Sequence, residues 1–123
     1  MTAHRFGKAR RVRRRGEYKR AFESGTRVNG RHFTLVMVPN TASRTRLGIV
    51  ASRKLGNAVE RNRAKRVIRE IFRQTALPGG GPGVDLVVIP RDSVFNAAFP
   101  DLENDFRGAL RRGFSRLHVH AAG

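Results

Sequence analysis

Cysteine is absent from this chain of 123 residues, and tryptophan is absent as well. Without cysteine the chain has no disulfide, no thiol catalysis and no cysteine-bearing zinc site. No apolar run approaches the length of a membrane span. The basic N-terminus lacks the apolar segment that a secretory signal needs. We therefore expect a cytoplasmic protein of one ordinary domain.

Acidic residues are scarce. The 9 Asp and Glu stand against 26 Lys and Arg, which gives a formal net charge of +17. In a compact fold these like charges repel one another. A bound polyanion offsets the repulsion, and the release of its counterions favours binding. The charge therefore indicates a nucleic-acid-binding protein more strongly than one that binds a membrane surface or an acidic protein. A self-sufficient nuclease would need a carboxylate cluster or a histidine pair at metal-ligand spacing, and the sequence has neither.

The chain divides into three parts by composition. Residues 1–15 are basic with hardly any apolar residue, and we expect a flexible arm that is ordered only on a partner. Residues 16–117 form a single RNA-binding α+β domain, and residues 118–123 a tail. Within the domain the apolar patterns and turn residues predict the following elements: a short helix ended by Gly25, a short strand at Val28, strands over 31–39 and 47–51 paired as a hairpin, a helix over 57–74, a loop over 78–83, a strand over 84–89, and a helix from 100 or 101 to 117.

The helix over 57–74 carries two contrasting faces. Its apolar stripe recurs at helical spacing, at Ala64, Val67, Ile68, Ile71 and Phe72. The opposite face carries Asn62, Arg66, Arg69 and Arg73. A solvated basic face is the ordinary explanation for such a helix. Here Glu60 and Glu70 are too few to neutralise the cations between 53 and 73, so the pattern favours a surface that follows RNA phosphates.

The same segment resembles a known motif. It reads Gly56-Asn57-Ala58-Val59, then Arg61-Asn62-Arg63, Lys65-Arg66 and Ile68-Arg69. This run is similar, without a gap, to the RNR motif of the bacterial ribonuclease P protein family. The resemblance extends less sharply over residues 13–117.

The resemblance implies a fold. Members of the family are α+β two-layer sandwiches, with a four-stranded sheet and about three helices, similar to the second domain of a small-subunit ribosomal protein. They contain a left-handed βαβ crossover around the motif helix, whereas the general rule alone predicts a right-handed one.

The resemblance also implies a function. The chain would be the protein subunit of a ribonucleoprotein endonuclease that removes the 5′ leader from precursor tRNA. The catalytic RNA and its Mg²⁺ ions would perform the hydrolysis, and the protein would raise substrate affinity and help metal ions bind. No protein partner is required. The residues expected to bind the RNA subunit are Arg53, Lys54, Asn57, Arg61, Asn62, Arg63, Lys65, Arg66 and Arg69.

A second site is implied between the first helix and the sheet. The resemblance places Tyr18, Phe22, Phe33 and Arg91 in a cleft for the single-stranded leader. Aromatic faces stack unpaired bases without strong sequence preference, which suits a variable leader. Val36 stands where some members have tyrosine. Core packing is the alternative explanation for Tyr18 and Phe22, and the sequence leaves both open.

No residue is expected to be catalytic or to bind a metal. Asp85 and Asp92 flank a strand at a spacing that does not suit a catalytic pair, and Asp101, Glu103 and Asp105 are placed to stabilise the start of a helix. A ribosomal protein would share the charge, size and fold type. It would bind ribosomal RNA and give no activity with ribonuclease P RNA.

Overall fold

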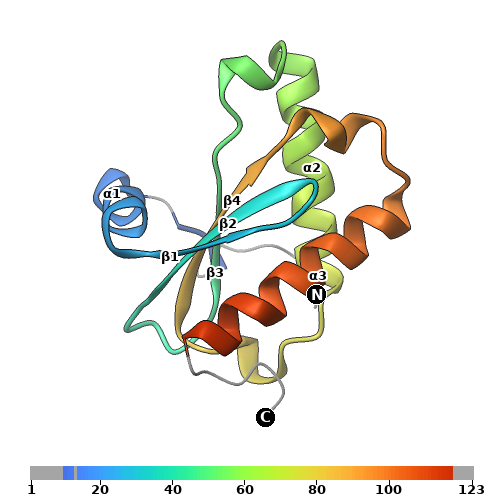
Figure 1. Cartoon of the computed structure of the whole chain (residues 1–123). Helices are drawn as coiled ribbons and strands as arrows, with labels where there is room; N and C mark the ends of the chain where they lie inside the picture. Colours follow the sequence, from blue (N-terminus) through green and yellow to red (C-terminus); the bar gives the residue numbers. More distant parts are fainter. Residues whose placement is uncertain (1–9, 13, 118–123) are drawn as a thin grey trace, which may run out of the picture.

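The computed structural model describes residues 10–12 and 14–117 and contains one sheet of four strands in the order β1-β2-β4-β3 (Figure 1). Strand β2 pairs with β1 and with β4 in antiparallel register, and β3 runs parallel to β4. The strands are β1 (Thr26–Asn29), β2 (Phe33–Pro39), β3 (Arg46–Ile49) and β4 (Val84–Pro90). The mixed sheet with its helices confirms the predicted α+β fold.

The predicted hairpin between strands 31–39 and 47–51 is wrong. Strand β2 forms its hairpin with β1, and β4 lies between β2 and β3. The run Val84–Ile89 is apolar on both of its faces apart from Asp85, which suits a central strand of a sheet covered by helices on both sides, and β4 takes that position. The connection from β3 to β4 is a parallel crossover through α2 (Ala58–Gln74). Its predicted left-handedness stays a prediction.

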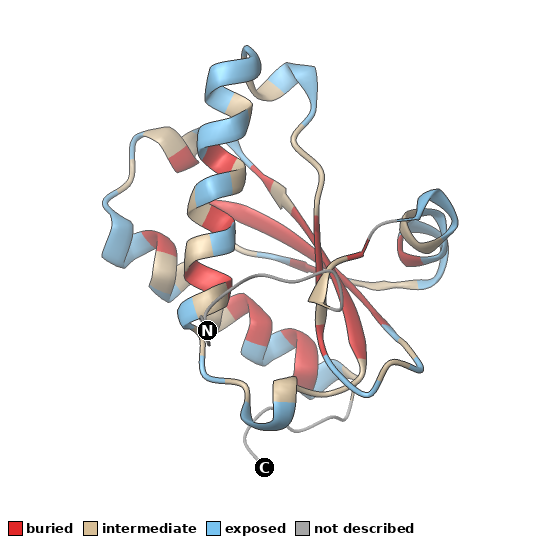
Figure 2. Ribbon diagram, turned by 180° about the vertical axis from the view of Figure 1, so that it is seen from behind, coloured by how far each residue is buried: buried red, intermediate tan, exposed pale blue. Residues whose placement is uncertain are grey.

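Two helices cover one face of the sheet and one helix covers the other (Figures 1 and 2). Helices α2 and α3 (Phe99–Arg116) pack over the larger core, whose biggest buried side chains are Phe33, Phe72 and Phe106. The rings of Phe33 and Phe106 meet edge to face, with centroids 5.7 Å apart. Helix α1 (Arg15–Ser24) covers part of the opposite face over a small cluster of Ala21 with residues of β2 and β4.

Both edges of the sheet are covered. At the β3 edge, the amide of Val12 donates to the carbonyl of Leu47 at 2.9 Å, and Val12 is buried. At the β1 edge, Arg112 and Arg116 of α3 donate to the carbonyls of Asn29 and Arg27, at 3.4 and 2.9 Å.

The predicted boundary of the basic arm is too late in the chain. Residues 10–12 pack beside β3 and α1 begins at Arg15, because one apolar side chain, Val12, is enough to dock this stretch. Residues 1–9 of the arm, and the predicted tail over 118–123, lie outside the described residues. The loop over 78–83 contains a short 3₁₀ turn, η3 (Pro78–Gly80), and Gly79, Gly80 and Gly81 all have positive φ that only glycine adopts readily. Among the described residues no helix is long and apolar enough to cross a membrane.

Candidate RNA interface

The start of α2 is fixed by a reciprocal cap. The Oδ1 atom of Asn57 accepts from the amide of Glu60 at 2.9 Å, and Oε1 of Glu60 accepts from the amide of Asn57 at 3.0 Å. Gly56 permits this, because a Cβ there would lie 2.4 Å from Oε1 of Glu60. The cap stabilises the helix by about 1 kcal/mol. Asn57, predicted to bind RNA, therefore has a structural task in the chain itself.

The cations predicted to bind the RNA subunit gather on one surface. We call this the η2–α2 surface, since it joins the turn η2 (Arg53–Leu55) to the outer side of α2. Its residues are Arg53, Lys54, Asn57, Arg61, Asn62, Arg63, Lys65, Arg66 and Arg69. All are exposed except Arg61 and Lys65, which are half-buried.

The charges of this surface are not neutralised within the described part of the chain. None of its cations takes part in the ion pairs found there. Arg63 lies over the ring of Phe95, with its guanidinium carbon 6.0 Å from the ring centre, which leaves its charge available. Arg73, on the same helix, is paired with Glu70. The surface is thus open to a polyanion from the protein side.

Arg10 and Arg11, which we predicted to belong to the flexible arm, lie against α2 and β3 respectively. The guanidinium of Arg10 lies 4.9 Å from the ring centre of Phe72 on α2, and burial lowers the pKa of Arg10 from its ordinary value. The Nε atoms of Arg10, Arg11 and Arg61 are buried, without a hydrogen-bond partner among the described residues. Val12, the one apolar residue between Arg10 and Arg15, was the signal that this segment docks.

The second predicted site lies on the α1 face of the sheet. Phe22 is 41% exposed at the end of α1, and Tyr18 is half-buried. Arg91 is exposed at the end of β4, where its Nη2 donates to Oγ1 of Thr34 at 3.1 Å and to Oδ1 of Asn29 at 3.3 Å. Thr34 points to the same face as Val36, so Tyr18, Phe22 and Arg91 share one side of the sheet.

Phe33 does not belong to this site. Its side chain is 0% exposed and packs in the core under α3, on the opposite face from α1. Successive residues of a strand point to opposite faces, and the run from Phe33 to Val38 is apolar enough that the sequence does not reveal which residues face which helix. The structure places Thr34 and Val36 on the α1 face instead.

Polar contacts hold α1 in position. Arg46 of β3 donates from Nε and Nη2 to the carboxylate of Asp85, at 2.7 and 2.8 Å, and its Nη2 lies 3.0 Å from Glu17 of α1. The hydroxyl of Tyr18 donates to the carbonyl of Val12 at 3.1 Å. A Cβ at Gly48 would lie 2.8 Å from that hydroxyl oxygen, so glycine allows the ring to lie against β3.

The comparisons with known proteins agree on one family. A family model described as Ribonuclease P matches residues 6–113. The chain belongs to the ribonuclease P protein family. It is 38% identical over 110 residues to the ribonuclease P protein component of Petrotoga mobilis, covering 88% of this chain and 84% of that protein. It is also 38% identical over 101 residues to that of Streptococcus pneumoniae, covering 82% and 81%.

Solved ribonuclease P proteins share the fold. The protein from Thermotoga maritima matches with a TM-score of 0.74 at 33% identity, covering 83% of this chain and 96% of that one. The protein from Staphylococcus aureus matches with a TM-score of 0.73 at 32% identity, covering 85% and 94%. Membership implies a role in tRNA processing and partnership with ribonuclease P RNA.

The described residues offer no metal centre. No group of three or more His, Cys, Asp or Glu side chains lies close enough to hold an ion in the part of the chain that the structure describes. What the described residues present is a cationic surface and a partly open sheet face.

Proposed function

We propose that this chain binds the catalytic RNA of ribonuclease P through the η2–α2 surface and the single-stranded 5′ leader of precursor tRNA on the α1 face. The RNA subunit carries the hydrolysis, and the particle acts in the cytoplasm. The observation that carries the proposal is the η2–α2 surface itself: its cations are exposed or half-exposed and take part in no ion pair among the described residues.

The geometry of α2 suits a phosphate track. Residues Asn62, Arg66 and Arg69 follow one another about one turn apart along a helix whose other side is fixed in the core. Each arginine that meets a phosphate releases condensed counterions, so affinity falls steeply with salt. Because α2 is anchored at its cap and along its apolar stripe, these side chains are presented without ordering any further backbone.

The α1 face suits an unpaired strand of variable sequence. Phe22 offers an exposed ring, Tyr18 a half-buried one, and Arg91 a cation at the end of the sheet. Stacking contributes about 1–3 kcal/mol per base with little dependence on the base. The absence of Phe33 from this face leaves fewer stacking groups than we predicted, in addition to the aromatic residue that Val36 replaces.

Magnesium belongs to the RNA in this proposal. The protein's contribution is to reduce the repulsion between the two RNAs, so that fewer Mg²⁺ ions are needed to bring the leader and the catalytic RNA together. Mg²⁺ would be bound by the RNA subunit and the substrate.

Reconstitution tests the proposal. The purified chain is added to a bacterial ribonuclease P RNA in low Mg²⁺, and 5′ processing of precursor tRNA is followed. We expect faster processing than with the RNA alone and none with the protein alone. Cleavage by the protein alone would indicate a self-sufficient nuclease, and absence of any acceleration would contradict the proposed function.

A matched pair of variants localises the RNA contact. Arg66→Ala should weaken assembly with the RNA subunit and lower the slope of log affinity against log salt by about one unit. Arg111→Ala, an exposed arginine on α3, has the same change of charge and should leave the slope nearly unchanged. Equal effects of the two variants would remove Arg66 from a specific contact.

A further inference from the structure

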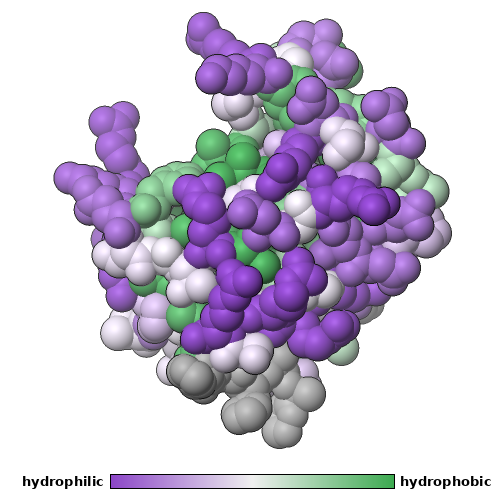
Figure 3. Space-filling model, viewed as in Figure 1, coloured by the Kyte–Doolittle hydropathy of each residue, from purple (hydrophilic) through white to green (hydrophobic). Residues whose placement is uncertain are grey.

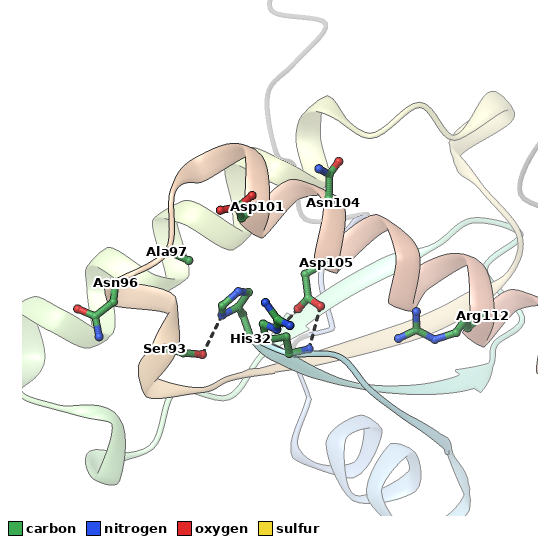
Figure 4. Close-up of a pocket in the computed structure, with 9 residues that line it drawn as sticks. His32, Ser93, Asn96, Ala97, Asp101, Asn104, Asp105 and Arg112 are labelled. Carbon is green, nitrogen blue, oxygen red and sulfur yellow. Dashed lines mark hydrogen bonds between the residues drawn. The ribbon is translucent and has the colours of Figure 1, made fainter.

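A pocket outside both proposed RNA sites lies at one end of the sheet. It has a volume of about 630 Å³ and opens between the β1–β2 turn, the turn η4 (Asp92–Phe95) and the first turns of α3 (Figure 4). Its lining comprises Arg31, His32, Ser93, Asn96, Ala97, Asp101, Asn104, Asp105 and Arg112. The volume is in the range of sites that hold one small organic molecule.

The walls of the pocket are tied to one another. The carboxylate of Asp105 accepts from the backbone amides of Arg31 and His32, at 2.8 and 2.7 Å. The Nδ1 atom of His32 is hydrogen-bonded to Oγ of Ser93 at 2.8 Å, which joins the β1–β2 turn to η4 (Figure 4). A Cβ at Gly30 would lie 2.9 Å from Oδ2 of Asp105, so glycine lets the turn approach the carboxylate this closely. The pocket is therefore formed before any ligand enters.

Several polar groups in the pocket remain unused. His32 is only 8% exposed and its Nδ1 is taken by Ser93, whereas its Nε2 has no partner among the described residues. The side chains of Asp101 and Asn104 likewise make no hydrogen bond or ion pair within the described ranges, and both are exposed. The His32 ring, the Asp101 carboxylate and the Asn104 amide thus line the same pocket, and the described residues leave these groups free to bond a ligand.

The pocket also contains both signs of charge. Arg31 and Arg112 belong to the lining beside Asp101, and the side chain of Arg112 makes only a 3.4 Å contact with the carbonyl of Asn29. Figure 3 shows that the side chains gathered over α3 are mostly hydrophilic. A ligand with only negative charge would be repelled by the carboxylate, and a ligand with only positive charge would be repelled by the arginines. A molecule with a phosphate at one end and hydrogen-bond donors at the other satisfies both.

We propose that this pocket binds one unstacked RNA nucleotide, with its base toward Asp101 and His32 and its phosphate toward Arg31 and Arg112. A base with an amino group fits best, because a carboxylate only accepts hydrogen bonds. Guanine is favoured, since its N1–H and N2–H₂ groups can both donate to one carboxylate. Unpaired bases in RNA are commonly read in this way, on their Watson–Crick edges.

The pocket adjoins the strand end at which the proposed leader site finishes, on the α3 side of the sheet. The amide of Arg91 donates to the carbonyl of His32 at 2.9 Å, so the proposed leader site and the pocket meet at the same strand end. A single strand that passes Arg91 and turns over this strand end would reach the pocket. The inference rests on the proposed function only in that its natural ligand is then a nucleotide of precursor tRNA.

The charge of Asp101 is unusual in its setting. Only 9 acidic residues occur in the chain, and two of them line this pocket. A carboxylate beside RNA repels phosphates unless it accepts from a base. The position of Asp105 is explained by the hydrogen bonds that its carboxylate accepts from the β1–β2 turn. Asp101 also suits the first turn of α3, yet that effect amounts only to about 0.3–1 kcal/mol and does not require a position in a pocket.

Binding of short RNAs to the purified full chain tests the proposal. The probes are labelled oligouridines about eight nucleotides long, with and without a single central guanine. We expect the guanine probe to bind about fivefold more tightly, the low end of what one good base contact provides. Asp101→Asn should abolish this preference, while its affinity for oligouridine stays equal or rises because a negative charge is lost. Asp92→Asn, an exposed carboxylate outside the lining, should keep the preference.

Addition of guanosine monophosphate tests whether the pocket binds a free nucleotide or only one that is part of an RNA strand. Shifts of the side-chain amide signals of Asn96 and Asn104 on its addition would place the base in the pocket. Three outcomes would each overturn the proposal. The nucleotide could shift only signals of the α1 face, the wild type could bind the two RNA probes equally well, or the guanine preference could survive in Asp101→Asn. These outcomes are independent of reconstitution: acceleration by the chain without any guanine preference refutes the pocket alone, and a guanine preference without acceleration refutes the proposed function alone.

Discussion

The two faces of the sheet are held by different forces. On the α2/α3 face, alternate residues of β2 (Phe33, Leu35 and Met37) are fully buried in a continuous apolar core. On the α1 face, the apolar cluster is small, and α1 is fixed by Arg46 between Asp85 and Glu17 and by the hydroxyl of Tyr18. A short helix with few apolar contacts is positioned by directional polar contacts at one end.

This difference separates stability from binding. Apolar burial is non-directional and works best when a face is completely covered. A face that receives an RNA strand, as we propose for the α1 face, cannot be covered completely, so its helix needs contacts that define position without filling the surface. The α2/α3 face therefore stabilises the fold, and the α1 face leaves Phe22 and Arg91 accessible.

Replacing Phe33 should give the largest effect. Phe33→Ala removes a fully buried ring from the edge-to-face contact with Phe106 and should cost about 3–5 kcal/mol of unfolding free energy, measured in urea. Phe22→Ala, the same change at an exposed position, should cost less than about 1 kcal/mol. Similar small losses for both would return Phe33 to the leader site.

Removing the arginine that anchors α1 comes next. Arg46→Ala leaves the carboxylate of Asp85, only 2% exposed, without its cation and should cost about 3 kcal/mol in the same measurement. Arg73→Ala breaks the more exposed pair with Glu70 and should cost about 0.5 kcal/mol. If Arg46→Ala were equally mild, the ion network would not be what positions α1.

Phe22→Ala should act on binding rather than stability. We expect a loss of about fivefold in affinity for precursor tRNA with a long leader, because one stacked base contributes about 1 kcal/mol or slightly more. Affinity for mature tRNA, measured in the same assembled particle, should not change. An equal loss for both RNAs would assign Phe22 to packing.

Tyr18 should show the smallest effect, together with a dependence on pH. Burial raises the pKa of its phenol above the ordinary value of 10.0, against the opposing positive charge of Arg69. The folded protein therefore retains the phenol proton at a pH where the unfolded chain has lost it. The stability that depends on Tyr18 is full below about pH 10 and falls as the pH rises from there.

The chain has one tyrosine and no tryptophan, so its ultraviolet titration reports Tyr18 alone. Tyr18→Phe should cost about 0.5–1.5 kcal/mol at neutral pH, through loss of the bond to Val12, and should reduce the alkaline loss of stability. A titration midpoint at or below pH 10 would contradict the burial of this hydroxyl.

The sequence was most informative where a pattern of residues is compatible with only one secondary structure. The stripe from Ala64 to Phe72, with Asn57 before it, predicts a helix over 57–74, and the structure has α2 over Ala58–Gln74 with Asn57 as its cap. The cationic side of that helix follows from the same spacing. The RNR resemblance over this segment is confirmed by the family match.

Other features depend on contacts that the sequence does not specify. β4 lies between β2 and β3, and no local pattern in the chain specifies this order over the predicted hairpin. The faces of β2 are ambiguous because apolar residues occur on both. The pocket joins residues about 60 to 70 positions apart through Asp105 and Ser93, a juxtaposition that no local pattern reveals.

The contacts at the two sheet edges bear on how the protein behaves at high concentration. Arg112 and Arg116 of α3 donate to carbonyls of β1, and the amide of Val12 donates to the carbonyl of Leu47. A further strand would find the carbonyls of Arg27, Asn29 and Leu47 already bonded. These contacts hinder the edge-to-edge pairing by which the sheets of two molecules could join.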